Sequence, residues 1–205
     1  MIVTIDGPAA SGKGTLARRL GETLGMPVLD TGLLYRSVAD QLLRSGQPLD
    51  DAQAALEAAR AVNLANLDRD RLAGAGFGDA ASRVAVMPEV RAALLKLQQD
   101  FARRPGGAVL DGRDTGTVIA PEAEVKIFVT ASPEVRAVRR FRELAGRSEA
   151  ATYEQVLSDI RKRDARDAER AAAPLKPAPD AVLLDTTDLD IEAAFREVLK
   201  IVRRA

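Results

Sequence analysis

The sequence predicts an α/β fold in which helices flank a mainly parallel sheet of five strands. Short β-rich runs alternate with stretches of helical periodicity, which is typical of βαβ units. The expected strands are 2–6, 27–30, 108–111, 125–130 and 181–185, and four of these five end in aspartate. Ligands of such sheets bind outside the carboxyl ends of the strands, so the aspartates predict a site at that edge.

Length and composition limit the possible functions. The 205 residues suffice for one domain, 1–205, that could carry a small mobile insertion. Lys plus Arg and Asp plus Glu both total 30, so no overall basic field indicates a nucleic-acid or membrane partner. The absence of Cys and His excludes thiolate chemistry and Ser-His catalysis. No apolar run approaches the roughly 20 residues of a membrane span, and no signal-peptide pattern is present, so a cytoplasmic protein is expected.

The first strand leads directly into 7-GPAASGKGT-15, which fits the pattern G-x-x-x-x-G-K between a strand and a helix. In a phosphate-binding loop of this kind, backbone N–H groups converge on phosphate oxygens, and Lys13 can reach the β and γ phosphates. A tight strand-to-helix turn that happens to precede a lysine is the alternative. The candidate nucleotide ligands are Gly7, Pro8, Ala9, Ala10, Ser11, Gly12, Lys13, Gly14 and Thr15.

Gly14 departs from the usual pattern, because the hydroxyl that normally follows the lysine has moved to Thr15. A shift of one residue along a helix rotates the side chain by about 100° around the helix axis, so a direct bond from Thr15 to Mg²⁺ cannot be assumed. Mg²⁺ often keeps several waters and binds mainly through substrate phosphates. The candidate metal partners are therefore Thr15 and Asp111, the latter at the end of an apolar strand, with contact expected through water.

Arginines follow two of the predicted strands. Tyr35 and Arg36 lie one turn into the helix after the second strand, and Arg113 and Asp114 follow the third. An acceptor phosphate and a transferring phosphoryl group repel one another until positive charge neutralises them. These arginines therefore predict a second anion site beside the loop. The alternatives without a role in catalysis or binding are a capping role for Asp111 and a surface ion pair between Arg113 and Asp114.

The later part of the sequence predicts an insertion and a pair of helices. Residues 50–78 are Ala-rich and lead into 74-GAGFGDA-80, so an insertion with one helix and a glycine-rich turn is expected. Ser132 and Thr152 have the sequence context of helix N-caps, which predicts two helices around the loop 146–151. In the second helix, one face carries Arg163, Arg166, Asp167 and Arg170. That face is either solvated or part of a hinged lid over the phosphates.

Together the motifs resemble those of the bacterial cytidylate kinase family, nucleoside monophosphate kinases with a phosphate loop. The resemblance rests on 5-IDGPAASGKGT-15, 29-LDTGLLYR-36, 111-DGRDTGTVIAPEAEVKIF-128, 132-SPEVRAVRR-140, 159-DIRKRDARDAERAAAPL-175 and 180-DAVLLDT-186. It implies the three-layer P-loop kinase fold, with an acceptor-binding insertion at about 50–85 and a helical lid at about 133–172. It also implies direct in-line transfer of a phosphoryl group from ATP to CMP or dCMP with Mg²⁺. A monomer is expected.

The resemblance also implies roles for individual residues. The loop 7–15 would bind the ATP phosphates, and Lys13, Arg113, Arg163 and Arg170 would be the catalytic charges. The substrate-binding set would be Thr31, Tyr35, Arg36, Ser82, Arg91, Arg113, Asp114, Arg163, Asp167 and Arg170. Within it, Ser82, Arg91 and Asp114 would read cytosine, because a carboxylate accepts from the exocyclic amine and a guanidinium donates to ring acceptors.

The chain departs from the family pattern in the insertion, which is shorter than usual and lacks an evident β element. Pyrimidine selectivity could be looser as a result. The alternatives are a kinase for UMP or another small acceptor, which would not need the trio Ser82, Arg91 and Asp114, and a nucleotide-dependent switch with slow turnover. A switch would not need the arginines of a second anion site.

Overall fold

The computed structural model describes residues 1–204 and contains one five-stranded parallel sheet of order β2-β3-β1-β4-β5. The strands are β1 (Ile2–Asp6), β2 (Val28–Asp30), β3 (Ala108–Gly112), β4 (Val125–Thr130) and β5 (Val182–Asp185). The predicted parallel sheet is confirmed, with strand ends within one residue of expectation. In the register, Asp30 lies beside Asp111 and Asp6 beside Gly112, so the strand-end carboxylates gather at one edge.

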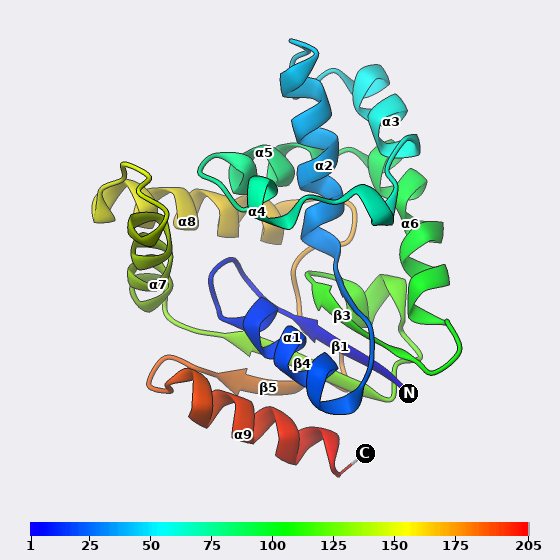
Figure 1. The fold of residues 1–205 in the computed structure, drawn as a ribbon, viewed down its shortest axis with the longest axis vertical. Coiled ribbons are helices and arrows are strands. Elements are labelled where there is room, and N and C mark those ends of the chain that lie inside the picture. The colour runs from blue at the N-terminus through cyan, green and yellow to red at the C-terminus, as the bar shows by residue number, and fades with distance from the viewer. Residues whose placement is uncertain (205) are drawn as a thin grey trace.

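Helices cover both faces of this sheet (Figure 1). They are α1 (Lys13–Leu24), α2 (Thr31–Arg44), α3 (Ala52–Arg60), α4 (Arg69–Leu72), α5 (Phe77–Val84), α6 (Pro88–Ala102), α7 (Pro133–Gly146), α8 (Tyr153–Glu169) and α9 (Ile191–Val202), with a 3₁₀ turn at Leu64–Asn66 and a π-helical turn at Thr115–Ile119. Leu16 of α1 and Val198 of α9 belong to the core on one face, and Leu34 and Leu94 belong to the core on the other. None of the helices in residues 1–204 is long and apolar enough to cross a membrane.

The segment between α2 and α6 contains more helix than the sequence predicts. The expected single helix is α3, but α4 and α5 follow it, and α5 begins inside the glycine-rich stretch. Side-chain caps begin three of these segments: Asp51 accepts from the first turn of α3, Asn63 from the 3₁₀ turn and Asp68 from the first turn of α4. Gly76, with φ of 80°, precedes α5 in a conformation that favours glycine. Short capped helices lack an apolar period, so the sequence pattern did not reveal them.

Helices α7 and α8 lie at the side toward which the strand arrows point (Figure 1). Ser132 and Thr152 accept hydrogen bonds from the backbone N–H groups three residues later, which confirms both predicted N-caps. The two helices share a small apolar core of their own, which includes Leu144 and Ile160. This helix pair therefore stands as a unit over the carboxyl edge of the sheet.

Candidate active site

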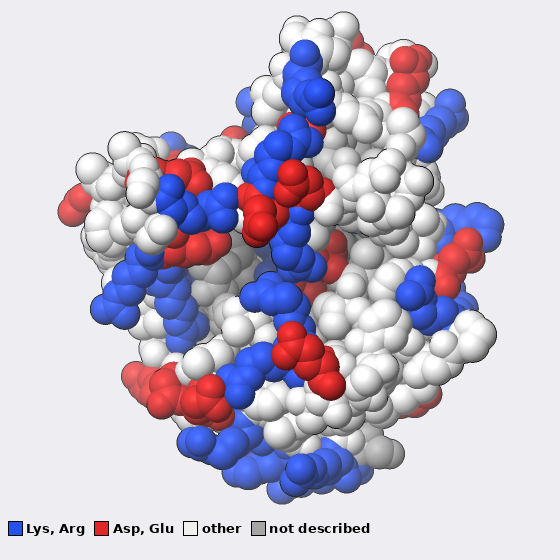
Figure 2. All heavy atoms as spheres, in the orientation of Figure 1, with Lys and Arg blue, Asp and Glu red and all other residues white. Residues whose placement is uncertain are grey.

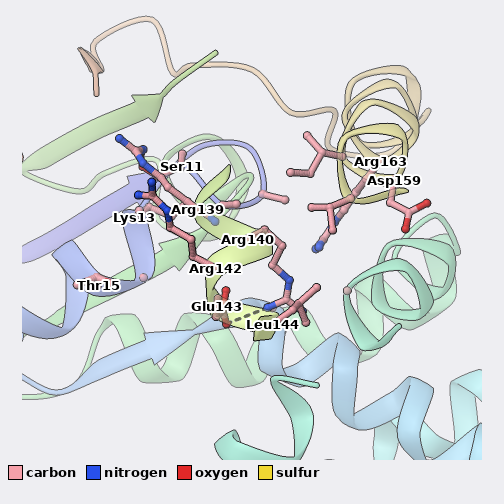
Figure 3. A pocket seen from close by; sticks show the side chains of 18 of the residues that line it. Ser11, Lys13, Thr15, Arg139, Arg140, Arg142, Glu143, Leu144, Asp159 and Arg163 are labelled. Carbon is pink, nitrogen blue, oxygen red and sulfur yellow. Dashed lines mark hydrogen bonds and ion pairs between the residues drawn. The ribbon is translucent and has the colours of Figure 1, made fainter. Parts of the chain in front are cut away.

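A cavity of about 950 Å³ opens at the carboxyl edge of the sheet. Its walls come from the loop after β1, the strand ends, α7, α8 and the turn before α5. Figure 3 shows Lys13 and Arg139 on one side of this cavity and Arg163 on the other. Figure 2, in the orientation of Figure 1, shows a hollow in the molecular surface beside a band of Lys and Arg side chains. The cavity thus lies where the strand-end aspartates predict a site.

The loop 7–12 joins β1 to α1 and lines this cavity from Ala9 onward. A Cβ on Gly7 would lie 2.0 Å from the carbonyl oxygen of Val129, so only glycine lets the loop leave the sheet so close to β4. The Ser11 hydroxyl is buried and has no hydrogen-bond partner within residues 1–204. A buried hydroxyl without a partner is available to a ligand oxygen.

Gly14 faces Asp111 across the start of α1. A Cβ on Gly14 would lie 2.9 Å from Asp111 Oδ2, and the Lys13 ammonium is 3.7 Å from Asp111 Oδ1. Burial raises the pKa of Asp111 and lowers that of Lys13, while each charge favours the ionised form of the other. A side chain at position 14 would therefore require the Asp111 carboxylate of this buried ion pair to shift.

Asp167 of α8 is the centre of one buried cluster. Ser82 Oγ donates to its Oδ1 at 2.8 Å, Arg113 Nε donates to its Oδ2 at 3.0 Å, and Arg163 Nε lies 3.9 Å from Oδ2. Burial raises the pKa of Asp167, but Arg113 and Arg163 outweigh that effect and lower the pKa to about 2. The carboxylate is therefore ionised at neutral pH and ties α5, α8 and the end of β3 together.

Asp114 is the centre of a second buried cluster. It pairs with Arg91 of α6, and Arg170 Nη2 lies 3.6 Å from its Oδ1. The Arg91 guanidinium lies 5.6 Å from the centre of the Tyr35 ring. Burial raises the pKa of Asp114, and the two guanidinium groups oppose that shift. Arg113 and Asp114 thus pair with different partners, so the alternative of a surface ion pair between them is wrong.

The structure divides the predicted substrate residues between the cavity wall and its surroundings. Arg36, Arg113 and Arg163 line the cavity together with Lys13 and Asp111. The predicted cytosine-reading trio, with Tyr35, Asp167 and Arg170, does not contribute to the cavity wall. These residues belong to the two clusters, where all are buried except Arg91, whose side chain is 10% exposed. In this arrangement the charged groups of these clusters pair with one another.

Several predicted residues have defined backbone partners. Thr31 Oγ1 donates to the carbonyl of Asp111 at 2.9 Å, and Arg36 Nη1 donates to the carbonyl of Leu72 at 2.9 Å. The Thr15 hydroxyl accepts from Arg18 at 3.3 Å. Thr31 thus joins the start of α2 to β3, and Arg36 joins α2 to α4.

The four charged residues expected on one face of α8 do not all lie together. Arg166 pairs with Asp79 of α5 at 2.8 Å and does not reach the buried clusters. The helix ends at Glu169, and Arg170 has extended backbone angles, so its side chain reaches Asp114 from the following loop and not from the helix face. Helical spacing alone did not reveal where α8 ends.

Sequence reasoning missed functional candidates on α7 and β1. Arg139 lines the cavity and donates to the carbonyl of Ser11 at 3.3 Å and to Thr186 Oγ1 at 3.0 Å. Asp6 is buried and accepts from Thr115 N at 2.9 Å and from Gly116 N at 2.8 Å, which holds the loop after β3. The arginine spacing in 132-SPEVRAVRR-140 and the strand-end position of Asp6 were the signals that could have found them.

Sequence comparison shows which known proteins the chain is similar to. A family model described as cytidylate kinase matches residues 3–204. The cytidylate kinase of Methylocella silvestris is 62% identical over 205 residues, covering 100% of this chain and 95% of that protein. That of Xanthobacter autotrophicus is 63% identical, covering 100% and 99%.

Two solved structures share the fold at low identity. One is an uncharacterized protein from Eubacterium ventriosum, with a TM-score of 0.58, 12% identity and coverage of 100% of this chain and 99% of that one. The other is a gluconokinase from Sinorhizobium meliloti, with a TM-score of 0.52, 17% identity and coverage of 99% and 91%. These likenesses support the α/β kinase fold alone.

Proposed function

Because the chain belongs to the cytidylate kinase family, and so phosphorylates CMP with ATP, we propose that the loop 7–15 holds ATP and that the two buried clusters hold CMP. The observation that carries the proposal is the placement of Lys13, Arg36, Arg113 and Arg163 around one cavity at the strand ends. Four cations there suit two phosphate groups that must approach one another. A binding switch would not require this second set of charges.

The chemistry of the Asp114 cluster suits cytosine. Asp114 offers acceptor oxygens and Arg91 offers N–H donors, and at present they satisfy each other. Cytosine presents an amine donor next to ring acceptors, so it could replace this pairing with bonds to both side chains. Uracil presents a carbonyl in place of the amine, which Asp114 would repel. The proposed acceptors are therefore CMP and dCMP, and Ser82, which bonds to Asp167, would read cytosine from the neighbouring cluster.

The sugar and phosphates would lie nearer the cavity. We assign Asp167 and Arg163 to the sugar, and Arg36 and Arg113 to the acceptor phosphate, with Thr31 close by. Lys13 and Arg163 face the transferring phosphoryl group across the cavity. Arg170 would join them as 133–172 closes as a lid and 50–85 closes over the acceptor. All these groups come from one chain, so a monomer is sufficient.

The residues beside the loop fit Mg²⁺ carried mainly by the nucleotide. Within residues 1–204 no cluster of three or more His, Cys, Asp and Glu side chains forms a cage for a metal ion. Burial raises the pKa of Asp111, Lys13 and Arg113 oppose that shift, and Asp30 adds to it. Asp111 and Thr15 would hold the ion through water. Bound there, Mg²⁺ would neutralise charge on the phosphates.

Transfer itself then depends on position and charge. The acceptor phosphate is largely ionised near neutral pH, so an in-line reaction needs no strong general base. This agrees with the absence of histidine from the sequence. The chain would align two phosphates, neutralise them with lysine and arginine, and exclude water so that ATP is not hydrolysed.

The test is ADP formation from Mg·ATP with CMP, dCMP, UMP, AMP, GMP or no acceptor. We expect fast turnover with CMP and dCMP, slower turnover with UMP, and little with the purine nucleotides or without an acceptor. ATP hydrolysis that is indifferent to every acceptor would contradict the proposal and favour the switch.

A further inference from the structure

One residue of the phosphate loop has an unfavourable backbone conformation. Ala10 has φ of 57°, in the left-handed region that costs free energy for any residue except glycine. Such a conformation persists only where its surroundings hold it. The carbonyls on both sides of Ala10 are held, since Ala9 O accepts from Arg136 Nη1 and Ser11 O from Arg139 Nη1, each at 3.3 Å.

These two bonds also orient the loop N–H groups. In a trans peptide the C=O and the following N–H point in opposite directions. A fixed carbonyl on Ala9 therefore turns the N–H of Ala10 away from α7, and a fixed carbonyl on Ser11 does the same for Gly12. Both Ala10 and Gly12 line the cavity. The two arginines thus hold the loop in a form that can present N–H groups to phosphate.

Arg136 connects this loop to the lid helix. Its side chain is 4% exposed. Its Nε donates to the carbonyl of Ala131 at 2.8 Å, and its two terminal nitrogens donate to Asp164 of α8 at 3.0 and 2.7 Å. One guanidinium therefore contacts the end of β4, the phosphate loop and α8 at once.

Pairing of α7 with α8 does not by itself require a buried arginine. Arg161 of α8 pairs with Glu134 of α7 at 2.8 Å, and both side chains are more than half exposed. That pair joins the same two helices without contacting the loop. The burial of Arg136 and its bond to Ala9 therefore need an explanation beyond helix pairing.

We propose that Arg136 is a positioning residue that couples the lid helix α8, through Asp164, to the ATP-binding form of the phosphate loop. The inference rests on the proposed role of the loop in binding ATP. Coupling of this kind is reciprocal, so a change that releases Asp164 or Arg136 weakens ATP binding, and bound ATP favours the docked position of α8. Helix α8 also carries Asp167 and Arg163 of the proposed acceptor site, but Ser82 and Arg113 hold Asp167 without Arg136, so CMP binding should change much less than ATP binding.

The test is calorimetric titration of the whole protein with ATP and, separately, with CMP. Arg136→Met should raise the Kd for ATP about tenfold and change the Kd for CMP less than twofold. Asp164→Asn, which keeps the bond to Ala9, should give a smaller loss in ATP affinity. The matched control is Arg161→Met, which removes the exposed pair between the same helices and should leave both Kd values unchanged.

A rescue separates positioning from a merely structural role. Glycine adopts a left-handed conformation without steric cost, so Ala10→Gly should recover much of the ATP affinity in the Arg136→Met background. Equal losses for ATP and CMP, or an ATP affinity that does not change in folded Arg136→Met, would overturn the inference. If Arg136→Met does not fold, Arg136→Lys takes its place, since it keeps a charge beside Asp164 but not the fork of donors. A native protein that fails to bind ATP would instead contradict the proposed function.

Discussion

The phosphate loop and the Asp167 cluster both serve phosphate-bearing ligands in our proposal, but they are built in opposite ways. The phosphate-binding segment 7–15 is continuous and runs from the end of β1 into the first turn of α1. The Asp167 cluster joins Ser82 and Arg113, which lie 85 and 54 positions away in the sequence. The loop can therefore form wherever its strand and helix form, whereas the cluster exists only when α5 and α8 pack together. The difference predicts that loop variants affect chemistry and cluster variants affect recognition and stability.

The largest effect is expected in the loop. Lys13→Met should lower kcat by about 100-fold to 1,000-fold, because it removes a cation from the cavity that holds the phosphates. The fold should survive, because burial already raises the pKa of Asp111 and a proton can replace the lost partner. Turnover and thermal unfolding measure the two effects. Unchanged turnover would contradict the assignment of the loop.

The next effect concerns recognition by the Asp114 cluster. Asp114→Asn should lower kcat/KM for CMP about 100-fold and reduce the preference for CMP over UMP, because it leaves Arg91 and Arg170 without their carboxylate. The KM for ATP should change little. Steady-state kinetics with each substrate test this, with Asp100→Asn, in an exposed pair with Lys96, as the control. A larger change in the KM for ATP than in the KM for CMP would contradict the assignment of the Asp114 cluster to CMP.

The third effect is on stability and its pH dependence. The pKa of Asp167 is about 2 in the folded protein, below its ordinary value, so this group stabilises the fold above about pH 4 and loses that contribution as pH falls through 2. Asp167→Asn should therefore unfold about 2 kcal/mol more easily at pH 7 and show a weaker loss of stability between pH 4 and 2. Urea unfolding across this range measures the difference. Parallel pH profiles for the two proteins would contradict the prediction.

The smallest effect is expected at the edge of the cluster region. Arg166→Met removes the pair with Asp79, in which the carboxylate is half exposed, and should change stability by less than about 0.5 kcal/mol and turnover by less than twofold. Unfolding and turnover assays on this variant sharpen the comparison, because Arg163 lies only one helical turn away but inside the cluster. A tenfold loss of turnover would show that Arg166 contributes to function and would contradict this prediction.

Most of the fold could be predicted from local pattern. The strands are short apolar runs, and helices α7 and α8 follow the N-caps Ser132 and Thr152, whose side chains accept hydrogen bonds from nearby backbone N–H groups. The segment with α4 and α5 could not be predicted in detail, because its short helices depend on caps and on packing against α2 and α8. The arginines of α7 were overlooked for the same reason, since their partners in the loop and in α8 are distant in sequence.

The sequence by itself determined the phosphate loop and the strand-end aspartates, because both depend on consecutive residues and on the direction of parallel strands. It also contained Gly14, but only the tertiary structure shows that this residue of α1 faces the Asp111 carboxylate of β3. Tertiary packing likewise decided that Arg113 pairs with Asp167 and that its chain neighbour Asp114 pairs with Arg91. Which residues form an ion pair depends on which elements pack against one another. A local sequence pattern does not specify the sequence-distant partner of a charged residue.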